Sequence, residues 1–418
     1  MVQKTETLII GGGVIGVCCA FYLNALGKKV LLVEKNDICS GSSYGNAGLI
    51  VPSHSTPLAA PGVIGQGLKW MTKPQSPFYI KPRLDWDLIA WLWKFRSVCN
   101  IQHVRQSIPV LHALHTASLK LYDELSGIES MDFALEKKGM LELYNTRKGY
   151  DKGLEENRLI KENGIENRIL PQKELREFIE DIRTAAVGGV YRPHDASLIP
   201  DRFVHQLARQ AERLGVRILT SCEVLDFGTD GRRVTGAKTT RGDIIAEEVV
   251  IAGGAWSAEL ARKLQLNLSM QAAKGYSINF RRPAQCPSLP VALAESKVVL
   301  TPMEDTLRVA GTLELAGLDQ SINLGRVQAI LKAVRAYFPD IDPDSLELLE
   351  IWRGLRPCSP DGLPYLGRTP RYDNVILATG HGMLGISLGP ITGKIVSQLS
   401  TNDNPAINMA ALSVERFL

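Results

Sequence analysis

The chain lacks the features that define several large classes of protein. Its 418 residues carry a net charge of only +4, and no basic stripe runs along the sequence, so we expect no nucleic-acid partner. Its seven cysteines are odd in number and irregularly spaced, which predicts neither a disulfide framework nor a metal site. This cysteine usage is typical of a protein in a reducing compartment.

Long hydrophobic runs are also missing. The most apolar stretch, residues 8–23, is shorter than the ~20 residues that span a bilayer, contains glycines and ends without a cleavage-like sequence. We therefore expect a cytoplasmic protein, with peripheral contact to the inner face of the membrane as the alternative to free solution. The length exceeds the size at which a single hydrophobic core stops growing, which predicts two domains.

What the chain does contain begins with a glycine-rich turn at its N-terminus. An apolar strand, residues 8–10, leads into Gly11, Gly13 and Gly16 and then into a helix that we expect to end at about Gly27. In this G-x-G-x-x-G spacing the first glycine permits a tight turn, the second lets the backbone approach a pyrophosphate, and the third packs the helix against the strand. The helix N-terminus offers free N–H groups to the phosphates. The turn therefore predicts a dinucleotide site.

An acidic residue completes this unit. A second apolar strand, Val30–Val33, delivers Glu34, whose carboxylate can accept hydrogen bonds from a ribose. The same carboxylate would repel a 2′-phosphate, which argues against NADP. FAD and NAD both remain open at this point.

Two further glycine-rich segments distinguish FAD from NAD. Each follows an apolar strand: residues 249–252 lead into Gly253–Ser257, and residues 375–378 lead into Thr379–Ile386. Ligands bind beyond the carboxyl ends of strands in open α/β sheets. The helix that begins in the last segment would direct amides and a positive dipole at the N1/O2 edge of a reduced flavin. A helix-packing turn is the alternative for each segment alone, but their joint occurrence favours an extended FAD.

The nucleotide-binding segments stand at the start, middle and end of the chain, which predicts two domains interleaved in sequence. The expected fold class is α/β, with a Rossmann-like FAD-binding domain interleaved with an α+β substrate domain built on a mainly antiparallel sheet. We assign residues 1–80, 191–270 and 350–418 to the FAD-binding domain. Residues 81–190 and 271–349 form the predicted substrate domain.

Short segments along the chain carry a family resemblance. They are Gly45–Gly48, Pro52–Gly62, Ser76–Arg83, Lys274–Ser277, Gly354–Pro357 with Pro360–Gly362, and Gly380–Gly382. With these residues the chain resembles the FAD-dependent amino-acid oxidoreductases, a family that includes D-amino acid oxidase, glycine oxidase, sarcosine oxidase and bacterial D-amino acid dehydrogenases. It is most similar to the dehydrogenase branch. The likeness covers essentially the whole chain, although residues 100–190 carry little distinctive signal.

The resemblance implies oxidative deamination of a small-molecule substrate, a free D-amino acid. A hydride would leave Cα for flavin N5, the imine would become a 2-oxo acid, and electrons would pass to a quinone or another acceptor. Substrates such as D-proline or 4-hydroxy-D-proline fall within this branch. Two alternatives stay open: an amine oxidase of the glycine/sarcosine type that uses oxygen, and a non-catalytic flavin-binding module.

The resemblance also implies a role for one arginine. A planar guanidinium matches a carboxylate better than an ammonium does. Arg356, in Gly-Leu-Arg-Pro, corresponds to the arginine that clamps the substrate carboxylate in family relatives, so we predict it as the catalytic and substrate-binding residue. The alternative is an arginine paired with an internal acid such as Asp361. We also predict substrate contacts by His54, Tyr276 and Glu314.

No dedicated base is required if the substrate binds with a neutral amine, a form that a desolvated site favours. Cys358 lies off the position at which some relatives attach flavin, so we expect non-covalent FAD. His112 and His115 have a spacing more typical of a helix face than of a metal site, and we predict no metal.

The predicted FAD contacts come from all of the nucleotide-binding segments. They are Gly11, Gly13, Val14, Ile15, Gly16, Glu34, Lys35, Ser42, Ser43, Asn46, Ala47, Gly48, Leu49, Val224, Gly253, Gly254, Trp256, His381, Gly382, Met383, Leu384, Gly385 and Ile386.

One tryptophan-rich helix, residues 86–95, has two interpretations. Trp86, Trp91 and Trp93 stand among leucines and isoleucines. Such a stripe is typical of a buried core helix, and it is also found where a helix contacts a membrane, here one that carries quinone.

Overall fold

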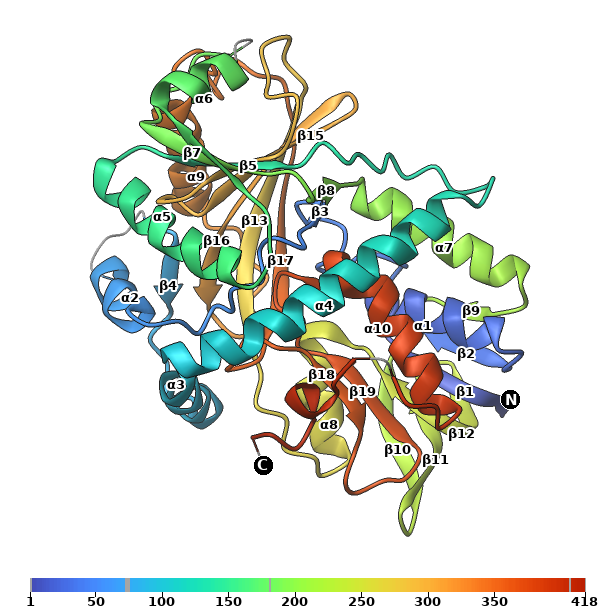
Figure 1. The fold of residues 1–418 in the computed structure, drawn as a ribbon. Helices are drawn as coiled ribbons and strands as arrows, with labels where there is room; N and C mark the ends of the chain where they lie inside the picture. Colours follow the sequence, from blue (N-terminus) through green and yellow to red (C-terminus); the bar gives the residue numbers. More distant parts are fainter. Residues whose placement is uncertain (1, 72–75, 180–181, 406, 418) are drawn as a thin grey trace.

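The computed structural model describes residues 2–71, 76–179, 182–405 and 407–417, which fold around two β-sheets (Figure 1). In the first sheet the strand order is β10 (Val224–Asp230), β11 (Arg233–Thr239), β12 (Gly242–Ile251), β1 (Gln3–Ile10), β2 (Val30–Val33) and β9 (Arg217–Leu219). β19 (Val375–Thr379) pairs with β12, and β18 (Tyr365–Arg368) pairs with β19. β12, β1, β2, β9 and β19 are parallel to one another.

The parallel strands of the first sheet are buried on both faces. Residues 30–33 of β2 and residues 7–10 of β1 are all buried. Strands are buried in this way when other elements cover both faces of the sheet. One face packs against α1 (Val14–Ala25), α4 (Ile101–Ser126), α7 (Pro200–Arg213) and α10 (Gly385–Ser400). The other face packs against α8 (Ser257–Lys263) and the residues around it.

The second sheet is mainly antiparallel. Its order is β17 (Leu348–Cys358), β13 (Gln271–Arg281), β16 (Thr306–Leu315), β15 (Val298–Met303), β14 (Val291–Leu293), β5 (Met140–Tyr144), β7 (Gly188–Arg192) and β6 (Arg168–Pro171). β4 (Phe78–Ile80) adds to β16 in parallel, and β14 and β5 form the other parallel pair. α9 (Leu324–Tyr337) covers one face of this sheet.

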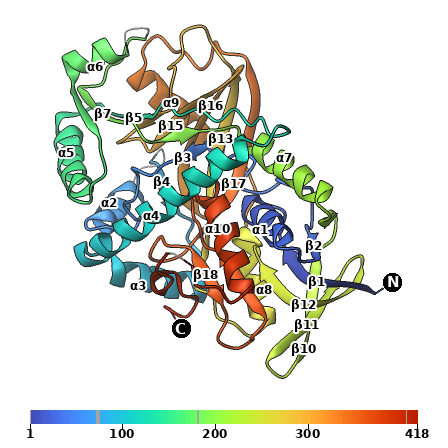
Figure 2. The ribbon, with the colours of Figure 1, turned by 45° about the vertical axis from the view of Figure 1, so that its right-hand side comes forward.

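The remaining elements are short or lie at the periphery. They are β3 (Leu49–Ile50), which pairs with β8 (Ala196–Ser197), and α2 (Val63–Met71), α3 (Trp86–Val98), α5 (Arg147–Glu162), α6 (Gln172–Phe178), η1 (Gly254–Trp256) and η2 (Ala410–Leu412). α4 is 26 residues long and crosses α10 in both views of the ribbon (Figures 1 and 2). It joins the two halves of the molecule along one side.

The strand pairing differs from the predicted domain boundaries in two places. β17, which begins near the predicted boundary at residue 350, pairs along its length with β13 of the second sheet. β4, at residues 78–80, also joins the second sheet. α4 contributes Leu111, Leu114 and Tyr122 to the core of the first sheet, although the sequence placed it in the substrate domain. Residues 1, 72–75, 180–181, 406 and 418 of the predicted domains lie outside the described residues.

Candidate active site

A cavity of ≈ 330 Å³ follows the carboxyl ends of the parallel strands in the first sheet. β1, β2, β12 and β19 each end at its wall, and residues 352–355 of β17 close it from the second sheet. This is the position at which open α/β sheets bind their ligands. Predicted contacts that line it are Gly11, Gly13, Val14, Ile15, Glu34, Lys35, Ser42, Ser43, Asn46, Val224, Gly253, Gly254, Trp256, His381, Gly382, Gly385 and Ile386. Gly16, Ala47, Gly48, Leu49, Met383 and Leu384 lie outside this wall.

The glycine turn brings the backbone of β1, α1 and β12 into close contact. Gly11 has a φ of +118°, and a Cβ there would overlap the carbonyl of Ala252. A Cβ on Gly16 would overlap the carbonyl of Gly11, so this glycine serves the packing of α1 on β1 without facing the cavity. At the start of α1 the N–H of Val14 donates to Ser43 Oγ at 3.0 Å. Because Val14 and Ser43 both line the cavity, the N-terminus of α1 lies at the cavity.

One end of the cavity carries the acid that follows β2. Glu34 accepts hydrogen bonds from the N–H groups of Gly12 (2.7 Å) and Asn36 (2.9 Å), one on each carboxylate oxygen. Beside it, the Lys35 ammonium lies 3.5 Å from the centroid of the Trp256 ring. Burial lowers the pKa of Lys35, and the nearby carboxylates oppose this shift. A ribose hydroxyl and an aromatic base suit this combination of carboxylate and indole.

The other end is formed by the loop before α10. The Gly382 N–H donates to the carbonyl of Pro357 at 2.8 Å, which ties this loop to β17. His381 is buried, and its Nε2 lies 3.0 Å from Thr392 Oγ1. Its Nδ1 has no hydrogen-bond partner among the described residues. Burial lowers the pKa of His381 to about 3, so the imidazole is neutral.

These features fit FAD along its length. The carboxylate of Glu34 suits the ribose, the glycine turn and the N-terminus of α1 suit the pyrophosphate, and the start of α10 with the unpaired Nδ1 of His381 suits the flavin. The individual contacts remain predictions. Their joint position along one cavity supports them.

Arg356 lies on β17, and its guanidinium has no carboxylate partner. Its Nη1 donates to the carbonyl of Thr312 at 2.7 Å, and among the described residues it takes part in no ion pair. The surrounding protein lowers the pKa of Arg356 by desolvation, although the side chain is only half-buried. Asp361, the predicted alternative partner, accepts from Arg416 at 2.6 and 3.0 Å instead. Arg356 is thus a half-buried cation without an acidic partner; it lies outside the wall of the cavity, to which its neighbours Leu355 and Pro357 belong.

Tyr276 and Glu314 do not lie with Arg356. In the antiparallel register Arg356 is opposite Ala273, whereas Tyr276 is opposite Arg353, so Tyr276 faces the other side of the sheet. On that side, which α9 covers, the Tyr276 hydroxyl donates to Glu314 at 3.0 Å. The two segments are neighbours in the sheet, but a shift of one residue along a strand changes the face on which a side chain lies.

A buried lysine completes the network around Tyr276 and Glu314. Lys274 is 1% exposed, and its ammonium lies 3.9 Å from Glu314 and 3.3 Å from Asp319. The Glu314 carboxylate therefore already has a cation and a hydroxyl as partners. This arrangement accounts for both predicted residues as parts of the sheet's own polar network.

His54 lies in the loop after β3 and outside the wall of the cavity. The His54 side chain is exposed in part. Desolvation by the surrounding protein lowers the pKa of His54 to about 4, and the positive charge of Arg192 lowers this pKa further. Arg192 itself forms a buried ion pair with Glu142 at 2.7 Å. The neighbouring Ser53 donates through its N–H and hydroxyl to buried Asp195, at 3.0 and 2.6 Å.

The two histidines whose spacing was interpreted as a helix face bond to different segments. His112 Nδ1 lies 3.0 Å from the carbonyl of Pro52, and His115 Nδ1 lies 2.6 Å from Ser387 Oγ on α10. Within the described part of the chain no group of three His, Cys, Asp or Glu residues could hold a metal ion.

Two residues that support the loop beside the cavity belong to no sequence motif. Arg308 on β16 is buried and donates to the carbonyls of Tyr44 (2.9 Å) and Asn46 (2.7 Å), so it holds the loop that flanks the cavity. Trp352 fits against Gly45 of the same loop, where a Cβ would overlap its ring. The only local signal for Arg308 is a charged residue among the apolar residues of β16.

The fold and cavity define an FAD-binding α/β oxidoreductase. Residues 6–399 match the family described as FAD dependent oxidoreductase, and the chain belongs to that family. It is 33% identical to a D-amino acid dehydrogenase of Helicobacter pylori over 95% of each chain, and 32% identical to one of Vibrio atlanticus over 99% of this chain and 100% of the other. Its structure is similar to glycine oxidase from Geobacillus kaustophilus, with a TM-score of 0.81, 26% identity and 99% of both chains covered.

The comparisons confirm the predicted fold class, the FAD cofactor and the assignment as an oxidoreductase. Among the described residues, no helix has the length and apolar character needed to cross a membrane.

Proposed function

We propose that this protein is a dehydrogenase that oxidatively deaminates free D-amino acids to 2-oxo acids. The observation that carries the proposal is the guanidinium of Arg356, which is bonded to the Thr312 carbonyl and has no acidic partner among the described residues. A carboxylate is the natural partner of such a group, and every α-amino acid supplies one. The two D-amino acid dehydrogenases that match along nearly the full chain support the D configuration.

In the proposed reaction the residues act as follows. Arg356 binds the substrate carboxylate with the donors that Thr312 leaves free, which fixes the position of Cα. FAD, when bound, supplies the acceptor for the hydride that leaves Cα. The amine binds neutral and loses one N–H proton to solvent as the C=N bond forms, and water then hydrolyses the imine to the 2-oxo acid and ammonia. His54 and His381, with pKa values of about 4 and about 3, are weak bases at neutral pH.

A panel of free D- and L-amino acids tests this proposal, with anaerobic loss of flavin absorbance as the readout. D-amino acids, including D-proline and 4-hydroxy-D-proline, should reduce the flavin. Arg356→Ala should keep its FAD but need on the order of 100-fold more substrate for half-reduction. Equal reduction of parent and variant would show that Arg356 is not the clamp. A protein whose flavin no amino acid reduces would be a flavin-binding module instead.

The electron acceptor is proposed to be a quinone or a similar molecule rather than oxygen. The full-length likeness to dehydrogenases supports this, while the likeness to glycine oxidase favours the alternative of an oxygen-using amine oxidase. Measuring dye reduction and peroxide release on the same D-amino acid separates them. Peroxide formed in equal amount to the product, with no gain from added dye or quinone, would assign the oxidase.

An exposed apolar surface at α2 and α3 supports contact with a membrane that carries such an acceptor. Trp86 is 84% and Trp93 is 71% exposed, and Ile89 lies between them on the same stripe of α3. Other exposed apolar side chains are Ile64, Leu68 and Met71 on α2 and Leu84 just before α3. α2 and α3 lie at the same edge of the molecule in both ribbon views (Figures 1 and 2). Soluble monomers rarely expose a contiguous patch of this kind.

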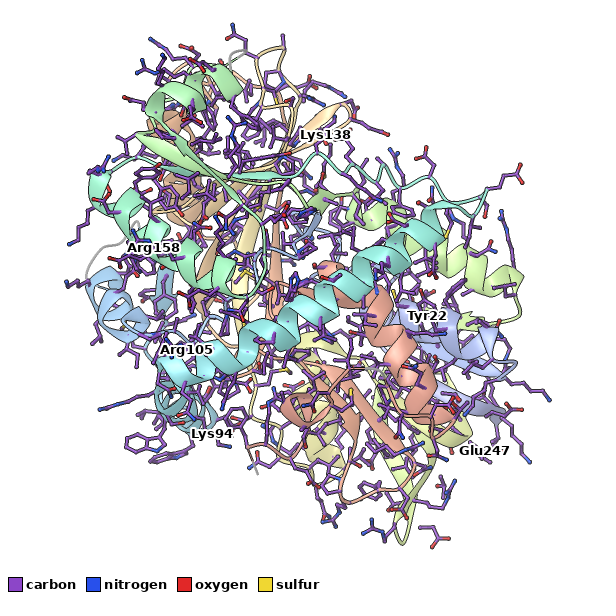
Figure 3. All side chains as sticks on the ribbon, in the orientation of Figure 1. Tyr22, Lys94, Arg105, Lys138, Arg158 and Glu247 are labelled. Carbon is purple, nitrogen blue, oxygen red and sulfur yellow. The ribbon has the colours of Figure 1, made fainter. Side chains whose placement is uncertain are left out.

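Basic residues accompany the α2–α3 surface. Lys94 on α3 and Arg105 on α4 lie at this edge (Figure 3), and Arg96 is exposed on α3. Tryptophan favours the interface of a bilayer, and lysine and arginine favour anionic headgroups. We therefore propose peripheral binding to the inner face of an anionic membrane.

Flotation with vesicles tests the membrane proposal. The parent should float with phosphatidylglycerol-containing vesicles, and the double variant Trp86→Ser/Trp93→Ser should not. The control is Ile169→Ser/Leu324→Ser, which removes two exposed apolar side chains outside this surface. Flotation of all three proteins to the same extent, or of none, would contradict the proposal.

A further inference from the structure

The guanidinium of Arg356 rests against a strand position that has no side chain. A Cβ built on Gly275 of β13 would have the Nη1, Nη2 and Cζ atoms of Arg356 as its three nearest neighbours, all well under 3.0 Å away. Gly275 pairs with Gly354 in the neighbouring strand, so the arginine crosses from β17 over an open part of the sheet. The side chain of any other residue at 275 would occupy the place where the guanidinium now lies.

The backbone conformation does not by itself require glycine at position 275. Its φ lies outside the left-handed region, so an alanine could adopt the same backbone conformation. The close neighbours of the added Cβ are atoms of a flexible side chain, not of the backbone. An alanine there would thus displace the arginine and leave the strands paired.

Thr312, which has a strained backbone conformation, accepts a hydrogen bond from the guanidinium. Thr312 has a φ of +67°, although it is β-branched, and such residues rarely adopt this conformation. It lies in a bulge, because between the pairs 274–314 and 276–311 one residue of β13 (275) is opposite two of β16 (312 and 313). The bulge directs the carbonyl of Thr312 at Arg356 Nη1, 2.7 Å away. Strain of this kind is found where the surrounding structure fixes a functional group.

We propose that Gly275 and the Thr312 bulge are positioning residues that set the direction of the Arg356 guanidinium. Gly275 leaves the space in which the planar group lies, and the Thr312 carbonyl engages Nη1. The remaining donors are thereby presented together to a carboxylate. This inference rests on the proposed function, in which Arg356 binds the substrate carboxylate.

The test compares substrates that carry a carboxylate with those that do not. The holoenzyme, Gly275→Ala and Arg356→Ala are assayed on D-alanine and D-proline and on the two corresponding carboxamides. In Gly275→Ala we expect kcat/KM for the acids to fall on the order of 10- to 100-fold, mainly through KM, because the clamp is misplaced. Turnover of the carboxamides should stay within about twofold, since they do not use the charge of Arg356. FAD content should equal that of the parent.

Gly311→Ala is the matched control. Gly311 lies on the adjacent strand β16, and its added Cβ would approach Val298 and Ile330 on the α9 side at 3.0 and 3.3 Å. It disturbs the packing of the same sheet without contact to Arg356. This variant should lose stability while it keeps the parent's preference for acids over carboxamides. Thr312→Gly, which suits the positive φ and keeps the carbonyl, should also keep the preference.

The outcomes separate the two proposals. If the parent shows no preference for acids, or if Arg356→Ala keeps it, the carboxylate clamp itself is wrong. If Arg356→Ala loses the preference and Gly275→Ala keeps it, the clamp stands and the positioning role of Gly275 is overturned. A parallel fall for acids and carboxamides in Gly275→Ala also overturns it, because that pattern marks a general structural defect.

Discussion

The carboxylate of Glu34 accepts a hydrogen bond from the main-chain N–H of Gly12, with 2.7 Å between Oε2 and the nitrogen. The other oxygen accepts from the N–H of Asn36 at 2.9 Å. The acid at the end of β2 is therefore oriented by the backbone of the glycine turn and of its own loop. The two parts of the N-terminal motif, which are more than twenty residues apart in sequence, form one unit.

Replacing this carboxylate should weaken FAD binding without unfolding the protein. Glu34→Gln keeps the size of the side chain but loses its charge, and hydrogen bonds to charged groups contribute about 1.5–3 kcal/mol. We expect FAD affinity to fall at least about tenfold, measured by equilibrium dialysis of the cofactor. Glu259→Gln, at an exposed acid on the same cavity wall, is the control and should change affinity less than about twofold. Equal losses in both variants would contradict a specific role for Glu34.

Asp195 should make the stability of the fold depend on pH. Burial raises the pKa of Asp195 from 3.8 to about 6, against the opposing effect of its bonds from Ser53. The folded state thus holds this proton more tightly than the unfolded state does. The contribution to stability is complete below pH 3.8 and is lost as the pH rises towards 6.

Asp195→Asn removes that titration, because the amide cannot ionise and can still bond to Ser53. Relative to the parent, the variant should gain up to about 3 kcal/mol of stability between about pH 4 and pH 7. Thermal unfolding across this range measures the gain, and Asp226→Asn at an exposed acid should show none. A stability difference that stays constant with pH would mean that Asp195 does not titrate in this range.

The flavin should be released intact when the protein is denatured. Burial raises the pKa of the Cys358 thiol to about 11, with Arg356 as the smaller, opposing influence, and the thiol rather than the thiolate is present at neutral pH. Because the thiolate is the reactive form, Cys358 is a poor site for covalent attachment. Mass spectrometry of the denatured chain should show the unmodified mass, and Cys358→Ser should bind as much FAD as the parent. An added flavin mass at Cys358 would overturn this prediction.

Local patterns in the sequence predicted the parts of the fold that depend on neighbouring residues. The helix expected after the glycine turn is α1, Val14–Ala25, and the strand before Glu34 is β2, Val30–Val33. Both are apolar runs, and the glycines at positions 11–13 and 27 mark where the helix begins and ends. The position of the cavity could be predicted for the same reason, since strand ends in a parallel sheet meet at one edge.

The parts that depend on distant partners could not be predicted. The sequence placed Tyr276 and Glu314 with Arg356, and only the register of β13 against β17 and β16 shows that they face α9. The bulge at Thr312 has no sequence signal, because threonine is unfavourable at a φ of +67°. Gly275 belongs to a segment that carries the family resemblance, but its contact is with a side chain about eighty residues away.

Trp91 and Trp93 could not be told apart from the sequence, and the structure gives them opposite environments. Trp91 is 3% exposed, stacks on Phe95 with 5.1 Å between ring centroids, and donates through Nε1 to the carbonyl of Cys358 at 2.9 Å. Trp93 is 71% exposed. Two residues along a helix rotate a side chain by more than half a turn, so one faces β13 and the other faces solvent.

Alanine at these two positions should therefore have very different effects on the free energy of unfolding. Trp91→Ala leaves a large cavity and removes the hydrogen bond to the Cys358 carbonyl, and we expect a loss of about 3–5 kcal/mol. Trp93→Ala removes a mostly exposed ring that has the Arg96 guanidinium 5.9 Å from its centroid, and it should change stability by less than about 0.5 kcal/mol. Denaturant unfolding of the FAD-loaded protein measures both. Trp93→Ala should nevertheless weaken vesicle binding, so a variant of normal stability that binds vesicles as the parent does would count against the α2–α3 surface as the membrane contact.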